Sequence, residues 1–159
     1  MEGCRSATAE DLPRIAELAR GHRVEVEQYR GGLLWRDREA VAEPLEDSYG
    51  ALLDDAEACV LVGTIDDVVI GFGVGTVDRL RTGQALGVVR DLYVEPEARE
   101  IGVGEEIAQR LIAFFRAAGC VAADAWALPG DRMTKNFFED QGFVARGIVV
   151  HRSLTDDPE

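Results

Sequence analysis

The sequence predicts an α+β fold whose mixed, mostly antiparallel central sheet is flanked by helices. Apolar residues recur at helical spacing near the N-terminus, β-rich runs fill the middle, and helices alternate with strands in the last third. Hydrophobic residues make up 47% of the chain, which excludes a disordered protein, and 159 residues suit one domain. We therefore expect residues 1–159 to form a single domain without linker or repeat.

The N-terminal third is predicted to be helical. Thr8–Asp11 resembles a capping box, apolar residues follow at helical spacing, and Gly21 provides a stop. His22–Trp35 is expected to be irregular, as either a lid over a site or a connector. A second helical region is predicted from Arg36 to Asp54, and Pro44 should break or restart it.

A β-meander is predicted next. Strands at Cys59–Ile65 and Val68–Val77 flank Asp66-Asp67, a candidate hairpin turn, and a third strand covers Ala85–Val94. Alternate residues in the second strand are glycines: Gly71, Gly73 and Gly75. They share one face of the strand, so a ligand or a helix can approach this backbone closely, and helix packing is the favoured cause.

The last third should alternate between helices and strands. The expected order is a helix from Val103 closed by Gly119, a strand Cys120–Ala127, a helix Asp131–Gln141 and a final strand Val144–Leu154. Asp131 follows Pro-Gly and fits an N-cap. The tail, residues 155–159, should be frayed.

Charge and cysteine usage restrict the partners. The net charge of −13 argues against nucleic acid, and it either attracts a cationic acceptor or simply keeps the protein soluble. No apolar run reaches the roughly 18 residues that span a membrane, and the N-terminus is not that of a signal peptide. Three scattered cysteines without metal-ligand spacing indicate buried reduced thiols, a cytoplasmic location and no metal.

The segment Val88–Gly104 is the most informative in the chain. A β-rich run ends at Val94, Pro96 follows, and Arg99-x-x-Gly102-x-Gly104 opens an amphipathic helix. The first N–H groups of a helix lack intrahelical partners, so this turn could cradle a phosphate, although glycines also occur at helix starts for packing reasons. A dinucleotide fingerprint would need a third glycine, and a P-loop would need Gly-Lys-Ser/Thr.

This motif resembles the acyl-CoA-binding signature of the GNAT-superfamily N-acetyltransferases, and the order of elements over nearly the whole chain resembles their fold. The resemblance implies direct transfer from acetyl-CoA, without a metal, to an amine of a small molecule or protein, and it allows a homodimer. In that family pantetheine runs along the fourth strand and pyrophosphate sits on the glycine turn. The implied cofactor-binding residues are Leu92, Tyr93, Val94, Arg99, Glu100, Ile101, Gly102, Val103, Gly104, Asp131, Thr134 and Phe138.

The chain also departs from the family pattern. Phe138 stands where the family usually has the tyrosine that protonates the leaving thiolate, and Asp131 replaces a common asparagine. Glu100 and Ile101 replace a common glycine and a basic residue, whereas Arg99 is kept. No catalytic residue can therefore be assigned, and a non-catalytic acyl-CoA-binding domain remains the alternative function.

Four further residues near the predicted site have expected roles, and two of them have two interpretations each. Asp91 either anchors a proton-carrying water or is an ordinary exposed or salt-bridged residue, which is favoured. Arg90 either binds an acidic acceptor or, as favoured, pairs with a neighbour. Trp126 is expected to be a packing residue, and His22 a structural one.

Overall fold

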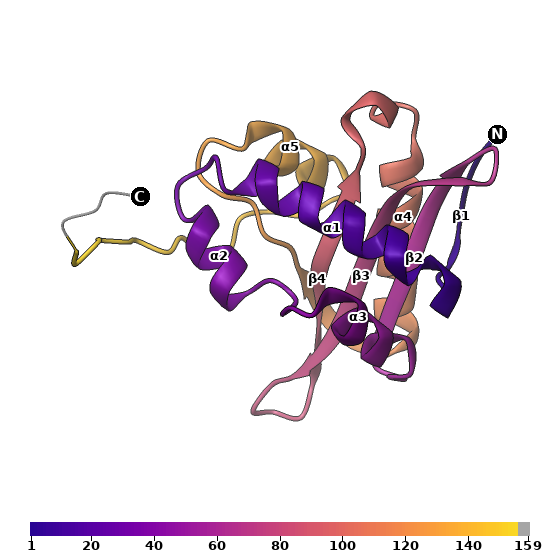
Figure 1. The fold of residues 1–159 in the computed structure, drawn as a ribbon. Helices are drawn as coiled ribbons and strands as arrows, with labels where there is room; N and C mark the ends of the chain where they lie inside the picture. The colour runs from indigo at the N-terminus through magenta and orange to yellow at the C-terminus, as the bar shows by residue number, and fades with distance from the viewer. Residues whose placement is uncertain (156–159) are drawn as a thin grey trace.

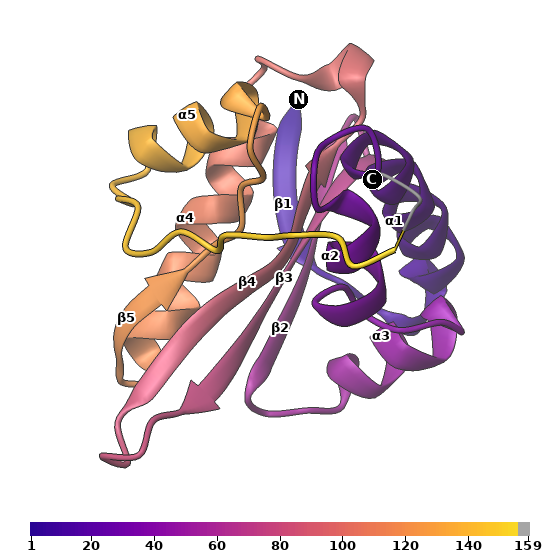
Figure 2. The ribbon, with the colours of Figure 1, turned by 90° about the vertical axis from the view of Figure 1, so that its left-hand side faces the viewer.

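The computed structural model describes residues 1–155 as a five-stranded sheet in the order β1-β2-β3-β4-β5, with helices on both faces (Figures 1 and 2). The strands are β1 (Glu2–Ser6), β2 (Ala58–Ile65), β3 (Val68–Arg79), β4 (Ala85–Val94) and β5 (Cys120–Asp124). The helices are α1 (Leu12–Val26), α2 (Gly32–Arg38), α3 (Leu45–Leu53), α4 (Val103–Ala117) and α5 (Arg132–Asp140), with 3₁₀ turns η1 (Ala9–Asp11) and η2 (Pro96–Ala98). β1 to β4 are antiparallel and β5 is parallel to β4, which confirms the predicted mixed sheet.

The predicted β-meander is present. Asp66 and Asp67 connect β2 to β3 with φ angles of 49° and 67°. Two consecutive positive φ angles match the right-handed twist of a hairpin, and aspartate tolerates them better than most residues. β1, which the sequence analysis did not predict, pairs with β2 at the edge of the sheet.

Helices α1 and α3 cover one face of the sheet, and α1 is longer than predicted. It continues through Gly21 to Val26. A Cβ at Gly21 would lie 3.2 Å from the Tyr93 hydroxyl, so this glycine gives room to a packed side chain rather than ending the helix. Arg23 and Val26 beyond it are buried, and these contacts outweigh the weak helix propensity of glycine.

The predicted irregular segment His22–Trp35 is therefore wrong over much of its length. Its first residues belong to α1, and its last belong to α2, where Trp35 is buried. The predicted helical region Arg36–Asp54 is divided between α2 and α3. Pro44 precedes α3 as its N-cap, so the expected restart at this proline is confirmed.

Helix α4 covers the opposite face and packs directly on glycines. A Cβ at Gly73 would lie 2.3 Å from Ile107, and a Cβ at Gly75 would lie 2.8 Å from Phe115. Both distances are far below van der Waals contact, so these positions cannot carry a side chain while α4 stays in place. Helix packing is confirmed as the reason for these two glycines of β3.

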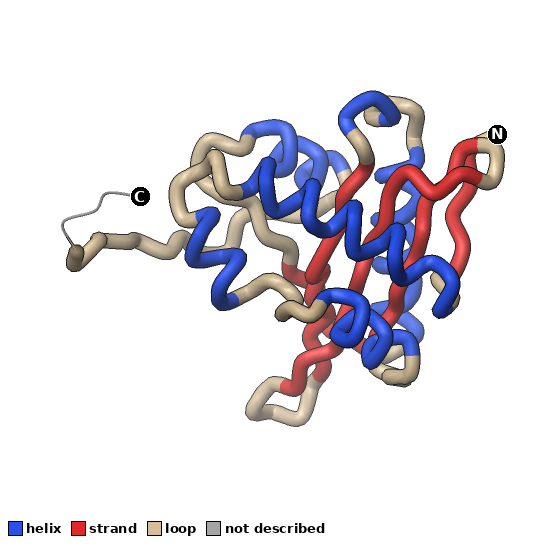
Figure 3. The backbone as a smooth tube through the Cα atoms, in the orientation of Figure 1, coloured by secondary structure: helices blue, strands red, loops and turns tan. Residues whose placement is uncertain are grey.

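The C-terminal part differs from expectation. β5 ends at Asp124, and the described residues after α5 contain no strand, so the predicted strand Val144–Leu154 is wrong (Figure 3). Arg146 pairs with Asp124 at the end of β5, and the chain then runs away from that strand, leaving Val150 91% exposed. Residues 156–159 of the predicted frayed tail lie outside the described residues. Within the described part, no helix is both long and apolar enough to cross a membrane.

The contact between β3 and α4 predicts how stability responds to one added methyl group. Gly73→Ala places a Cβ against Ile107 and should lower the free energy of unfolding by about 1–3 kcal/mol. Gly50→Ala is the matched control. Gly50 lies in α3, and its Cβ would lie 3.5 Å from Leu12, an ordinary van der Waals distance. The control should be neutral or stabilising by about 0.5–1 kcal/mol in urea unfolding. Equal stability of the two variants would contradict the proposed close packing.

Candidate functional site

Strands β4 and β5 diverge halfway along β4. Their pairing ends at Val88 and Asp124, and no strand in the described part of the chain pairs with that side of β4 from Val89 to Val94 (Figure 2). On the β3 side, adjacent residues Val74 and Gly75 face Asp91 and Val89, so Arg90 is an extra, bulged residue. The divergence leaves the backbone edge of β4 open from Val89 to Val94.

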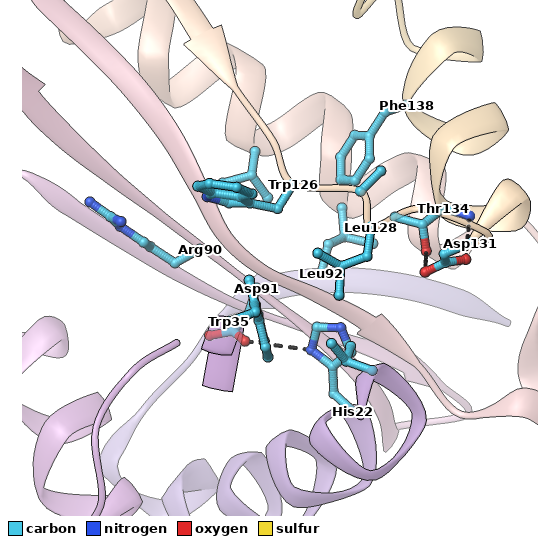
Figure 4. Close-up of a pocket in the computed structure, with 13 residues that line it drawn as sticks. His22, Trp35, Arg90, Asp91, Leu92, Trp126, Leu128, Asp131, Thr134 and Phe138 are labelled. Carbon is cyan, nitrogen blue, oxygen red and sulfur yellow. Dashed lines mark hydrogen bonds and ion pairs between the residues drawn. The ribbon is translucent and has the colours of Figure 1, made fainter. Parts of the chain in front are cut away.

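A pocket lies at this open edge, between α1, α2, β4 and the segment leading into α5. Its lining includes His22, Trp35, Leu92, Trp126, Thr134 and Phe138 (Figure 4). Trp126, expected to be a packing residue, is 41% exposed and lines the pocket. β5 ends before Trp126, and the extended chain carries the indole to the pocket instead of the core.

The start of α4 lies close to the same edge. A Cβ at Gly104 would contact Phe137 at 3.5 Å and Val94 at 3.6 Å, so the turn adjoins the end of β4 and α5. Gly102 has a φ of 94° and precedes α4 as its N-cap, with open space where its Cβ would lie. The amides that follow lack helical partners and carry the positive end of the helix dipole, which suits an anion.

The side chains around this turn contribute unequally. Val103 is buried in the core, so only its backbone can reach a ligand, whereas Ile101 is exposed. Glu100 has a φ of 71°, a conformation that glycine adopts freely and glutamate does not. Arg99 is held in place: its Nε donates to the Val94 carbonyl at 2.8 Å, and its Nη2 pairs with Glu25 at 2.8 Å.

Two further predicted residues have structural partners. Asp131 caps α5 as predicted, accepting hydrogen bonds from the Thr134 amide at 3.2 Å and hydroxyl at 2.7 Å. Phe138 is buried, and its ring centroid lies 5.3 Å from those of Phe137 and Phe143. The pocket wall at Phe138 is therefore aromatic and carries no hydroxyl, as the sequence indicated.

The structure confirms that Arg90 pairs with neighbours. Its Nε donates to the Thr76 hydroxyl at 2.8 Å, and its Nη2 lies 3.2 Å from an Asp78 carboxylate oxygen. Both partners are on β3, so the guanidinium charge is compensated within the sheet.

Asp91 is 3% exposed, so the interpretation of an ordinary solvent-facing residue is wrong, whereas a pairing with His22 agrees with the salt-bridged alternative. Tyr49 donates a hydrogen bond of 2.7 Å to its Oδ2 atom, and His22 Nδ1 lies 3.6 Å from Oδ1 (Figure 4). Burial and the Asp91 charge raise the pKa of Tyr49, so its hydroxyl remains a donor. The sequence offered one signal for the burial of Asp91. It alternates with Tyr93 in an apolar strand, so the two side chains are expected on the same face of the strand.

Comparison with known proteins agrees with this geometry. A search of curated proteins by sequence found no match. The fold is similar to glucosamine-6-phosphate N-acetyltransferase from Arabidopsis thaliana (TM-score 0.71, 15% identity, covering 98% of this chain and 99% of that one). It is also similar to ribosomal-protein-alanine N-acetyltransferase from Brucella melitensis (TM-score 0.67, 17% identity, covering 96% and 100%). A Bacillus halodurans protein gives a TM-score of 0.78 at 20% identity, covering 96% and 99%.

These identities are low, so the structural likeness establishes the fold alone. The sequence itself matches the acetyltransferase (GNAT) family over residues 21–143, a span that includes β4, the glycine turn and α5. The chain belongs to the GNAT family of acetyltransferases.

Proposed function

We propose that residues 1–159 act as one domain that transfers an acetyl group from acetyl-CoA to an amine of a small molecule or protein, by direct attack. The observation that carries this proposal is the open β4 edge beside the free amides of α4. An exposed strand edge can hydrogen-bond an amide-bearing chain such as pantetheine, and a helix start favours pyrophosphate. Leu92, Tyr93 and Val94 would supply the edge, and Gly102–Gly104 the amides.

The charges around the turn indicate which groups would hold the pyrophosphate. Glu25 already neutralises Arg99, and Glu100 brings negative charge to the turn. The backbone amides would therefore carry more of the binding than in a turn with a second basic residue. Asp131 and Thr134 adjoin the pocket and would line the path of the acyl chain.

The acceptor is proposed to be a cationic amine. An acidic group on the acceptor would need a free Arg90 guanidinium, and this guanidinium pairs with Asp78. The net charge of −13 remains, and a negative field attracts cations and repels the phosphate backbone of nucleic acids. A lysine side chain or a polyamine fits this field. The half-buried free thiols of Cys4, Cys59 and Cys120 support the cytoplasm as the location.

The alternative function, acyl-CoA binding without transfer, is favoured by one observation: no hydroxyl stands at Phe138 to protonate the thiolate. A thiol with a pKa of about 8.5 is a tolerable leaving group near neutral pH, so water can supply this proton. The two functions differ in turnover. Incubation with acetyl-CoA and pools of polyamines, lysine peptides and amino-acid amines, followed by mass spectrometry, should show a 42 Da gain, about the mass of one acetyl group less a proton. Binding without any mass gain would favour the alternative.

A first variant tests where acetyl-CoA binds. Gly104→Val places a branched side chain beside Val94 and Phe137 and should block phosphate from the amides. Acetyl-CoA at about 100 times Kd should raise the wild-type Tm by about 5–10 °C, and this shift should be lost. Gly147→Val, at an open position, is the control and should keep the shift. A folded Gly104→Val protein with the full shift would overturn the placement.

A second variant tests the leaving group. Phe138→Tyr adds a hydroxyl at the pocket wall with almost no change in shape. If water protonates the thiolate in the wild type, kcat should stay equal or rise, with general-acid catalysis setting an upper limit of about 10²–10⁴-fold. Phe114→Tyr on α4 is the control and should leave kcat unchanged. A lower kcat in Phe138→Tyr with intact acetyl-CoA binding would contradict water as the proton source.

A further inference from the structure

We infer that His22 takes the proton from the acceptor amine and that Asp91 orients the imidazole and stabilises its charged form. The inference rests on the proposed acetyl transfer, because it assigns the base for that reaction. A lysine-like amine has a pKa near 10.4, so only about one molecule in 2,500 carries a free lone pair at pH 7. A nearby proton acceptor lowers the resulting barrier.

The two side chains face each other across the boundary between α1 and β4. His22 Nδ1 lies 3.6 Å from Asp91 Oδ1 and is buried without a hydrogen-bond partner (Figure 4). This distance is too long for a hydrogen bond but close enough for a charge interaction between the carboxylate and an imidazolium. The Tyr49 hydroxyl donates a hydrogen bond of 2.7 Å to the other oxygen of Asp91, which fixes the carboxylate facing the imidazole.

The second ring nitrogen, Nε2, is the one that can reach a substrate. It lies across the ring from Nδ1, so it faces away from Asp91, toward the side where Leu92 and Leu128 line the pocket (Figure 4). The rings of Trp35 and Tyr93 contact the imidazole with centroid distances of 5.3 Å each. The histidine is therefore wedged at the open part of β4, beside the Leu92–Val94 edge proposed to bind pantetheine, and we place the thioester there.

The charged groups around His22 come from several elements of the fold. The titratable groups on the elements packed against this site are Arg23 and Glu25 on α1, Tyr49 on α3, Arg90, Asp91 and Tyr93 on β4, and Asp131 before α5. The buried Arg23 guanidinium interacts with Tyr49 and donates a hydrogen bond to the Val41 carbonyl. Glu25 is neutralised by Arg99, and Asp131 is occupied in capping α5. Asp91 therefore supplies the negative charge that directly faces the imidazole, and its burial strengthens that interaction.

The acceptor arrives as an ammonium ion and gives one proton to Nε2. Its lone pair forms the C–N bond to the thioester carbonyl carbon while the C–S bond breaks. A second nitrogen proton reaches the sulfur through water, which yields the amide, free coenzyme A and an imidazolium that returns its proton to solvent.

The test compares pH profiles of kcat/KM for the most active amine of the screen. In wild type, kcat/KM should fall on the acidic side as the imidazole becomes protonated. His22→Gln should lose about 10²-fold or more near pH 7, and the loss should shrink as the pH approaches the pKa of the amine, where free amine needs no base. Asp91→Asn should move the acidic limb to lower pH, because the imidazolium loses its charged partner.

The control is His151→Gln, the same substitution at the second of the two histidines, which is exposed and should leave rate and profile unchanged. Thermal shifts with acetyl-CoA should be equal in all variants, which separates binding from proton transfer. A wild type that acetylates while His22→Gln matches it at every pH would overturn this inference alone. A wild type that binds acetyl-CoA but acetylates no amine would overturn the proposed function and this inference together.

Discussion

The separation of β4 from β5 is the constraint on which the rest of the site depends. A backbone N–H or C=O that is shielded from water and left without a partner costs about 1–3 kcal/mol. Beyond Val88 no strand of the described residues pairs with the open side of β4, so side chains, water or a ligand must satisfy its backbone groups. The pocket and the start of α4 both lie where they do because this edge is open.

One strand then serves two purposes. After the bulge at Arg90, Tyr93 joins the core beneath α1, whereas Val94 joins the core beneath α4. Asp91 shares the α1 side and reaches His22, while Leu92 packs with the α4 side. The backbone edge of β4 is thus available for a ligand, and its side chains connect that ligand to polar groups on α1 and α3.

Sequence patterns correctly predicted the elements whose formation depends on residues close together in the chain. The strand Ala85–Val94, the helix from Val103 and the Asp131 cap were predicted from alternation, spacing and capping chemistry, and the structure has them. Predictions failed where distant contacts decide. Gly21 sits inside α1 because Tyr93, far along the chain, packs against it.

In the site, too, features built from neighbouring residues were predictable and those built from distant residues were not. The glycine turn is readable from sequence because its chemistry lies in consecutive backbone groups. The pair of His22 and Asp91 is not, since 69 positions separate them and the contact depends on how α1 crosses β4. The bulge at Arg90 also leaves no local signature, yet it changes which face the following side chains occupy.

The exposed C-terminal segment has a consequence for the behaviour of the protein in solution. Ile148, Val150 and Leu154 are each about nine-tenths exposed, and the strand edge of β5 on the side away from β4 is also uncovered in the described residues. Apolar β-branched segments and open edges promote pairing between molecules. The net charge of −13 opposes such contacts, but physiological salt screens it beyond about 8 Å. Colloidal stability should therefore decline as ionic strength rises or as the pH approaches the isoelectric point near 4.5.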